Sequence, residues 1–591
     1  SFNHLSPPKH KRDNMVSDEP KKESSYLTGW RLGMAISCLF FANFLIALDA
    51  NIINVAIPRI SSDFHALDDV AWYGTGYLLT ITTFQPLYGT FYRLFRTDVV
   101  YLISIIIFEL GTIICAAASS SPLFIVGRAI AGLGAAGVLQ GSLSIIGQVV
   151  ILEKRPLYMG LVISAFAVTV CLGPPLGGEF TEHASWRWCF WINLPIGAVV
   201  LIGLSIFLKV RGDANALRRL PLRSKLACVD FIGCTLFLGA VCCLLLALQW
   251  GGQTKPWSSV TIIGLFVGTV ALITLFAYVQ WQRDENALIP LRVLRKRNVL
   301  TSAMVLFFLG GAIYLFSYYL PFYFEAVRGI SAVTSGVNFI PLMLSQMVSL
   351  VIIGAVVKEC GHYVSDKRHQ MNVSKNDGYL TRLQVPFILF GNLVAIVGAA
   401  LLTQLDLHTA TIKWAAYFVV TGIGLGMAMQ LPYTAIHITL SAEDLPTGNA
   451  IAVLFYQLGG AISISMGQTV VLCTIEEELQ DKIPGLTSKE VFSAGAANLE
   501  SLVSTRVALT ILREIWNDGI QRNMYLAVSL IAAAVPFTLC MQWLNSKKVA
   551  RQIQAKEEME NTECETQKKS VLIEGSEVSS MKEAEDSDLH V

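Results

Sequence analysis

Long apolar runs separated by short polar segments recur along nearly the whole chain. Each run is close to the roughly 20 residues that a helix needs to cross the hydrocarbon core of a bilayer. We predict fourteen membrane-spanning helices and therefore an all-α polytopic membrane protein. They cover residues 30–58, 70–92, 98–119, 122–149, 157–181, 188–208, 228–250, 257–281, 299–324, 333–357, 385–404, 413–440, 447–475 and 523–544.

Composition supports this assignment. Of the 591 residues, 53% are hydrophobic and only 15% are charged, whereas soluble domains carry about 25% charged residues. A net charge of +1 gives no basic surface for nucleic acid. The 12 cysteines lack metal-ligand spacing, so neither a metal nor another cofactor is expected. No phosphate-cradling loop or paired nucleophile and base is recognisable, so we expect no enzyme activity.

Lysine and arginine predict the orientation of the chain. They are several-fold more abundant in the short loops that follow even-numbered spans, which places these loops and both tails in the cytoplasm. The tails, residues 1–29 and 546–591, are polar and are predicted to be disordered. The long loop 476–522 is then external, and its helical period over 499–520 predicts a helix lying on the membrane surface.

A weak internal repeat divides the chain into two halves. Gly89 ends the second span before a basic turn, and Gly354 ends the tenth span in the same way. The same offset in two halves is what a duplicated six-helix unit gives. The predicted domains are a six-helix bundle at 30–210, two linker helices with basic loops at 211–298, and a second bundle at 299–545.

Several motifs resemble those of the fourteen-span drug:proton antiporters of the major facilitator superfamily. They are LDANIINVAIPRI at 48–60, GRAIAGLGAAGV at 127–138, LGPPLGGEFTEHASWRWCFWINLPIG at 172–197, and LALQWGG at 246–252. The resemblance implies the major facilitator fold with a 6+2+6 arrangement of helices, and it is closest to fungal pumps that export toxins and other secondary metabolites. One departure is clear, because Tyr92 and Phe95 stand where the family has Asp and Gly in a charged latch after the second helix.

The fifth span contains a glycine–proline cluster that would end a helix in water. In lipid such a backbone is tolerated where it packs tightly on neighbouring helices. The resemblance implies that this cluster is the antiporter motif, which packs on the other six-helix set and seals the cavity against proton leak. Its residues are Gly173, Pro174, Pro175, Gly177 and Gly178.

Ionisable groups inside membrane spans are costly and are therefore candidates for function. Asp49 is the first candidate for proton coupling, Arg128 for its modulator, and Glu109 for a further proton site. The alternatives are a permanently ionised structural pair for Asp49, snorkelling for Arg128, and a satisfied helix contact for Glu109. For Asp230 and Glu325, near span ends, a solvated charge is favoured over a ligand.

Polar and aromatic side chains in the spans provide candidates for the substrate cavity. Each can instead hydrogen-bond a neighbouring helix, and tyrosines can also mark the membrane interface. The candidates are Asn54, Gln140, Gln430, Tyr318, Tyr319, Tyr456 and Gln457, with Gln148, Gln468, Phe316 and Tyr323 as further members of the same classes.

Residues 364–384 are polar and interrupt the pattern that the resemblance implies between two spans. Codons for Val-Ser, Leu-Thr and Gln can supply the donor, branch and acceptor sequences of an intron. We therefore consider a translated intron here, with a genuine cytoplasmic loop as the alternative.

Together these features predict a monomeric, proton-coupled exporter of small organic compounds that works by alternating access. Its expected partners are a small-molecule substrate, protons and the lipid bilayer. The plasma membrane is the expected location, with the vacuolar membrane as the alternative. Two rival functions stay open: a vacuolar carrier of basic amino acids or siderophores on the same fold, and a sensor without transport.

Overall fold

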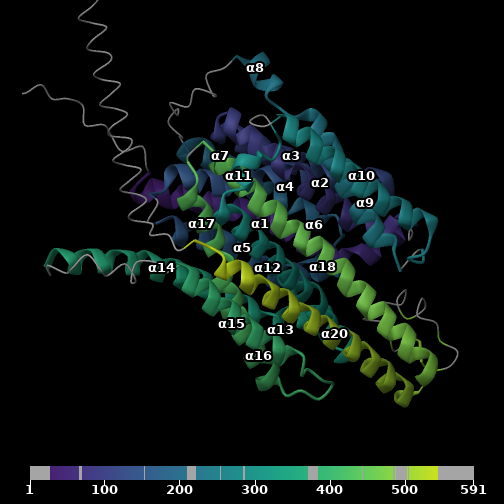
Figure 1. The fold of residues 1–591 in the computed structure, drawn as a ribbon. Coiled ribbons are helices and arrows are strands. Elements are labelled where there is room, and N and C mark those ends of the chain that lie inside the picture. Colours follow the sequence, from purple (N-terminus) through teal and green to yellow (C-terminus); the bar gives the residue numbers. More distant parts are fainter. Residues whose placement is uncertain are drawn as a thin grey trace, which may run out of the picture.

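The computed structural model describes residues 27–65, 69–151, 154–208, 221–252, 255–283, 287–370, 384–441, 443–483 and 505–542, with isolated residues between 486 and 503. Within these ranges the secondary structure is helical (Figure 1). The all-α prediction is therefore confirmed. The predicted tails lie outside the described residues, apart from residues 27–29 at the start of the first helix.

The first half of the chain forms the first bundle of helices. They are α1 (Gly29–Phe64), α2 (Val70–Leu94), α3 (Thr97–Ala117), α4 (Ser121–Val149), α5 (Arg155–His183), α6 (Trp188–Trp191) and α7 (Asn193–Phe207). After the short α8 (Leu222–Ala227), a hairpin of α9 (Phe231–Trp250) and α10 (Val260–Arg283) packs beside α2, and α11 (Leu291–Leu294) follows.

The second half forms the second bundle. Its helices are α12 (Arg297–Phe322) with the π-helical turn η4 (Tyr323–Val327), α13 (Ala332–Asn338), α14 (Ile340–Gln370), α15 (Gln384–Leu402), α16 (Thr411–Met429), α17 (Leu431–Thr439), α18 (Leu445–Lys482) and α20 (Arg506–Leu539).

Thirteen helices of the described residues are long and apolar enough to cross a membrane. The predicted second span is α2, a helix of 25 residues that is too polar to be among the thirteen. Its Thr82, Thr83 and Gln85 are fully buried, because α4, α18 and α9 surround it. A span enclosed by protein can carry polar side chains that lipid would exclude. The count of fourteen stays a prediction.

The two bundles repeat one packing order. In the first, α1 packs on α5 and α7, and α4 packs on α2 and α3; in the second, α12 packs on α18 and α20, and α16 packs on α14 and α15. Between the bundles, α5 packs on α14 as α18 packs on α2. This is the arrangement that the predicted duplication gives, while the domain boundaries at 210 and 298 stay predictions.

The predicted surface helix at 499–520 and the predicted last span are wrong as separate elements. The predicted surface helix from Arg506 onward and most of the last span belong to α20, which is continuous over 34 residues, and α18 likewise continues to Lys482. The two helices extend together beyond the rest of the bundle at the lower right of Figure 1. The first part of α20 packs on α12, where the Trp516 ring stacks on Phe322 with their centroids 6.1 Å apart.

Only part of the proposed intron lies in the described structure. Its first residues continue α14 as far as Gln370, and Gln384 begins α15. Residues 371–383 lie outside the described residues, so the intron hypothesis stays a prediction.

Candidate functional site

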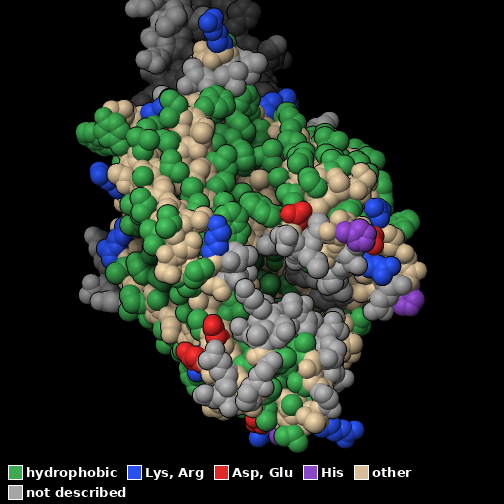
Figure 2. Space-filling view, turned by 90° about the vertical axis from the view of Figure 1, so that its right-hand side faces the viewer, with side chains coloured by type: hydrophobic (Ala, Val, Ile, Leu, Met, Phe, Trp, Pro, Cys, Tyr) green, Lys and Arg blue, Asp and Glu red, His purple; other side chains and the backbone are tan. Residues whose placement is uncertain are grey.

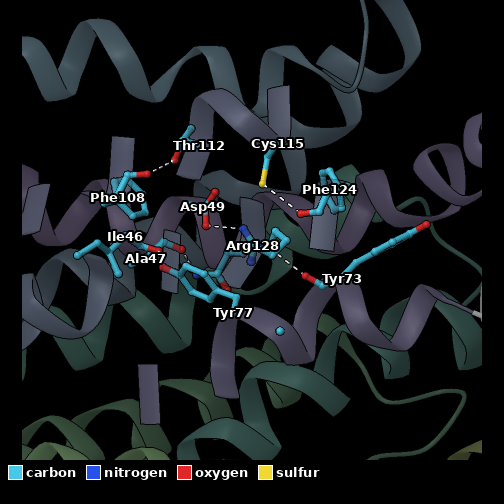
Figure 3. Close-up of polar contacts among 12 residues, drawn as sticks. Ile46, Ala47, Asp49, Tyr73, Tyr77, Phe108, Thr112, Cys115, Phe124 and Arg128 are labelled. Carbon is cyan, nitrogen blue, oxygen red and sulfur yellow. Dashed lines mark hydrogen bonds and ion pairs between the residues drawn. The ribbon is translucent and has the colours of Figure 1, made fainter. Parts of the chain in front are cut away.

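Asp49 and Arg128 form a buried ion pair in the first bundle (Figure 3). Arg128 Nη1 donates to Asp49 Oδ2 over 2.6 Å, and Arg128 Nε donates to the backbone carbonyl of Tyr73 over 2.9 Å. The guanidinium also lies 4.2 Å from the ring centroid of Tyr77. Both charged side chains are almost completely buried, so the snorkelling alternative for Arg128 is wrong in this structure.

Small residues let the helices around this pair approach closely. On α4, a Cβ added to Gly132 would collide with the α2 backbone at Tyr77, and one added to Gly127 would lie 2.7 Å from the sulfur of Cys115 on α3. Arg128 is therefore held in a packed interior among α1, α2 and α3, where a charge needs a partner.

Two glycines of the α5 cluster pack on α1 at Asn51 and Ile52, which follow Asp49 closely in the sequence. A Cβ added to Gly173 would lie 2.8 Å from the Cβ of Asn51, and one added to Gly177 would lie 2.7 Å from the carbonyl oxygen of Ile52. Gly178 alone of these glycines approaches the other bundle, at 3.4 Å from Val333. Gly173 and Gly177 therefore pack on α1, while Gly178 faces the second bundle, and the sealing role of the cluster stays a prediction.

Glu109 is buried on α3, and neither of its carboxylate oxygens has a hydrogen-bond partner among the described residues. Its Oε1 lies against α7, because a Cβ at Gly197 would overlap it. The alternative of a satisfied helix contact is not supported by this arrangement.

In the second bundle, Tyr314 on α12 donates its hydroxyl to Gln457 Oε1 on α18 over 2.5 Å. The rings of Tyr314 and Tyr456 lie 5.8 Å apart, and both tyrosines are half-buried. The sequence motifs did not single out Tyr314, although it lies one helical turn before Tyr318 on the same face.

The two predicted cavity tyrosines that follow have different surroundings. Tyr318 remains 37% exposed. Tyr319 is buried and donates to the carbonyl of Ile464 on α18 over 3.0 Å, so it joins two helices of its own bundle. Phe316 is also buried, and Tyr323 donates to the carbonyl of Asp406 over 2.8 Å.

Gln140 and Gln430 lie where the two bundles meet, at the predicted cytoplasmic end. Gln140 on α4 donates to the carbonyl of Pro446 at the start of α18. Gln430, between α16 and α17, donates to the carbonyl of Pro156 at the start of α5. Both glutamines are fully buried, and their predicted contact with substrate is untested in this conformation.

The remaining glutamines have other positions, and the side chain of Asn54 lies outside the described residues. Gln148 donates to Thr97 Oγ1 over 2.9 Å within the first bundle, and Gln468 is half-buried on α18.

The two charged groups predicted near span ends have different surroundings. Asp230 is buried rather than solvated, which corrects the prediction: it accepts from the Gly233 backbone over 2.8 Å and from Gln280 over 2.7 Å. Glu325 is half-buried in η4. Tyr92 on α2 donates to the carbonyl of Gly137 on α4 over 2.8 Å.

Figure 2 shows the face at the right-hand side of Figure 1, where hydrophobic side chains cover wide areas of the described surface and charged side chains are scattered among them. No group of His, Cys, Asp and Glu that could hold a metal occurs among the residues that the structure describes.

Two bundles of apolar helices, related by a repeated packing order and holding a buried ion pair, are the features of a polytopic membrane transporter. A family model described as Major Facilitator Superfamily matches residues 39–464. The chain belongs to this superfamily, as the motifs predict.

Its relatives include fungal efflux pumps. An MFS-type transporter, astH, from Aspergillus oryzae is 37% identical over 90% of this chain and 90% of that protein. An MFS-type efflux pump, MFS1, from Arthroderma benhamiae is 37% identical over 91% of this chain and 96% of its own. The efflux pump aflT from Aspergillus parasiticus is 36% identical over 83% and 91%. The solved human organic anion transporter MFSD10 (TETRAN) shares the fold, with a TM-score of 0.51 at 15% identity over 84% of this chain and 99% of that chain.

Proposed function

We propose that this protein exports small organic compounds from the cytoplasm in exchange for protons, by alternating access between its two bundles. The observation that carries the proposal is the buried Asp49–Arg128 pair. When Asp49 takes up a proton, its ion pair with Arg128 is lost, and the free energy of the surrounding packing changes. Proton binding can thereby bias one arrangement of the bundles over the other.

The substrate class that fits best is a neutral or weakly polar aromatic compound. Tyr314, Tyr318 and Tyr456 offer aromatic surface, and Gln457 offers an amide. The fungal relatives named as efflux pumps support export rather than uptake. We place the protein, as a monomer, in the plasma membrane with both tails in the cytoplasm.

The rival carrier of basic compounds lacks support in the second bundle. From residue 297 to 324, and again from 445 to 475, the sequence contains no Asp or Glu. A cationic substrate buried there would have no carboxylate partner in these two segments.

The test uses sealed vesicles that contain the purified protein and an internal pH dye. Addition of the neutral aromatic dye Nile red to wild-type vesicles with a proton gradient is expected to drive dye transport and proton movement in opposite directions, and a protonophore is expected to stop both. Asp49→Asn should abolish gradient-driven transport while the protein is still incorporated normally. Lysine in place of Nile red tests the rival carrier. Transport of lysine but not of the dye would overturn the proposed substrate class.

A further inference from the structure

Glu109, Asn193 and Gly197 form a second buried polar site in the first bundle, separate from the Asp49–Arg128 contact. Glu109 is 8% exposed and Asn193 is completely buried. Neither carboxylate oxygen of Glu109, and neither amide atom of Asn193, has a hydrogen-bond partner among the described residues. Four unpartnered polar atoms therefore lie in one interhelical region, where α3 packs on α7.

The geometry places the Glu109 carboxyl directly on α7. Its Oε1 fills the space that a side chain at Gly197 would need. Asn193 lies one turn before Gly197 on the same helix, and residues four apart share a helix face. Asn193 and Gly197 therefore lie on the same face of α7, where the side-chain amide of Asn193 can contact the carboxyl group of Glu109.

Among the described helices that pack on α3, none offers Glu109 a cation of its own. Of the helices packed on α3, α4 carries a single charged residue, Arg128, and α7 carries none. Arg128 is engaged by Asp49 of α1. The one charged residue of α2 is Arg93, in its last turn beside the start of α3 and several helical turns from Glu109. The one titratable group of α6 is the thiol of Cys189.

An ionised carboxylate without a partner is strongly disfavoured in such a place, so the neutral acid is favoured. A neutral carboxyl has one donor and an acceptor, which can match the carbonyl and the amino group of Asn193.

We propose that Glu109 is a second proton-binding site of the transport cycle. In this conformation Glu109 holds a proton while Asp49 is the anion bound to Arg128. When Asp49 is protonated, Arg128 loses its counter-ion, and ionisation of Glu109 restores a negative charge to the region. One proton is then taken up at Asp49 and one is released from Glu109, so the total charge of the three groups is unchanged. The inference rests on the proposed function, because it assigns the second acid of the same exchange.

The first experiment needs no substrate. Infrared spectra of the purified, lipid-reconstituted protein at neutral pH are expected to show the carbonyl band of a protonated carboxyl, which is missing from Glu109→Gln and shifted in Asn193→Ala. In Asp49→Asn, where Arg128 has lost its counter-ion, this band should weaken and a carboxylate band should grow. If wild type and Glu109→Gln do not differ in the protonated-carboxyl band, the proposal is overturned.

The second experiment separates a proton site that works in the cycle from a static buried acid. Glu109→Gln keeps the shape of the side chain but fixes it in a neutral state. We expect it to lower the rate of gradient-driven Nile red transport by about tenfold, which corresponds to about 1.4 kcal/mol in the activation free energy, and to flatten the dependence of this rate on pH. Glu109→Asp, which restores a carboxyl, should recover part of the pH dependence.

The two proposals fail in different ways. If wild-type transport ignores the proton gradient, the proposed antiport is wrong, although the infrared result still decides whether Glu109 holds a proton. If wild-type transport is coupled and Asp49→Asn is uncoupled, but Glu109→Gln matches the wild-type pH profile, then Glu109 is a structural acid and only this inference is overturned.

Discussion

The side-chain amide of Gln140 donates a hydrogen bond to the backbone carbonyl of Pro446, which lies in the other bundle. Gln430 makes the equivalent bond to the carbonyl of Pro156. In the repeated packing order, α4 corresponds to α16 and α17, and α5 corresponds to α18. The two bonds are therefore one contact made twice, each from a glutamine of one bundle to the first turn of a helix in the other.

The glycines of the internal repeat belong to the same contacts. A Cβ at Gly89 would lie 3.4 Å from the Pro446 carbonyl oxygen, and a Cβ at Gly354 would lie 2.9 Å from that of Pro156. Each accepting carbonyl is thus approached by a glutamine and by a glycine. We call these two contacts the glutamine latch, and it joins the bundles at the predicted cytoplasmic end.

Loss of the glutamine latch should favour the conformation that is open at this end. A hydrogen bond of this kind contributes about 0.5–1.5 kcal/mol, so Gln140→Leu with Gln430→Leu should change the ratio of the two conformations by about tenfold. Spin labels at the exposed positions Ile151 and Ser441 would report the change as a longer distance.

The control is Gln148→Leu. Gln148 lies on α4 as Gln140 does, but its amide bonds Thr97 within the first bundle. It should leave the distribution of label distances unchanged. An equal shift in the control and in the latch variant would contradict a specific role for the latch.

The positions of the helices and the buried ionisable residues could be predicted from local patterns in the sequence. Apolar runs placed the helices, and the cost of a charge in a span singled out Asp49, Arg128 and Glu109. Such patterns could not predict the latch, because the acceptor of Gln140 is a backbone carbonyl 306 positions away, and a backbone atom leaves no mark in the sequence. Asn193 was missed for a related reason. Its role depends on the absence of a side chain at Gly197, which lets the carboxyl group of Glu109 approach α7 from another helix.

The effects of substitutions at Arg128 and Asp49 on the stability of the protein should depend on each other. Arg128→Met leaves an unpaired carboxylate, and Asp49→Asn leaves an unpaired guanidinium, each of which should cost about 3–5 kcal/mol. The double variant removes both charges and should cost less than the sum of the two. Thermal unfolding of the four proteins in one detergent measures the coupling. Additive effects would contradict a direct pair.

Gly173 should tolerate no larger side chain, because its Cβ position is 2.8 Å from Asn51. Gly173→Val is expected to push α5 away from α1 near Asp49, to destabilise the protein by about 1–3 kcal/mol, and to increase proton leak through vesicles without substrate. Gly264→Val on α10 is the matched control, since nothing lies within 4 Å of its Cβ position. Equal leak in both variants would remove the role of Gly173 in sealing.

Asp406 organises the loop between α15 and α16 and should make its stability depend on pH. The Thr409 hydroxyl donates to Asp406 Oδ1 over 2.8 Å, as does the His408 backbone N–H. These hydrogen bonds lower the pKa of Asp406 below its ordinary value, and the bond from the Thr409 hydroxyl has the largest effect. A carboxyl with a lowered pKa in the folded state stabilises the fold above its unfolded pKa, and this contribution is lost as the pH falls through the folded value.

Asp406→Asn should therefore destabilise the protein at neutral pH, by less than about 1 kcal/mol because the side chain is exposed. The difference from wild type should vanish in acid, where Asp406 is protonated as well. The loop is also tied to η4, since Arg328 Nη1 donates to the Thr409 carbonyl over 2.7 Å. Hydrogen exchange of residues 403–410, compared between the two proteins across this pH range, measures the effect locally. A difference that persists unchanged in acid would show that the carboxylate charge is not its cause.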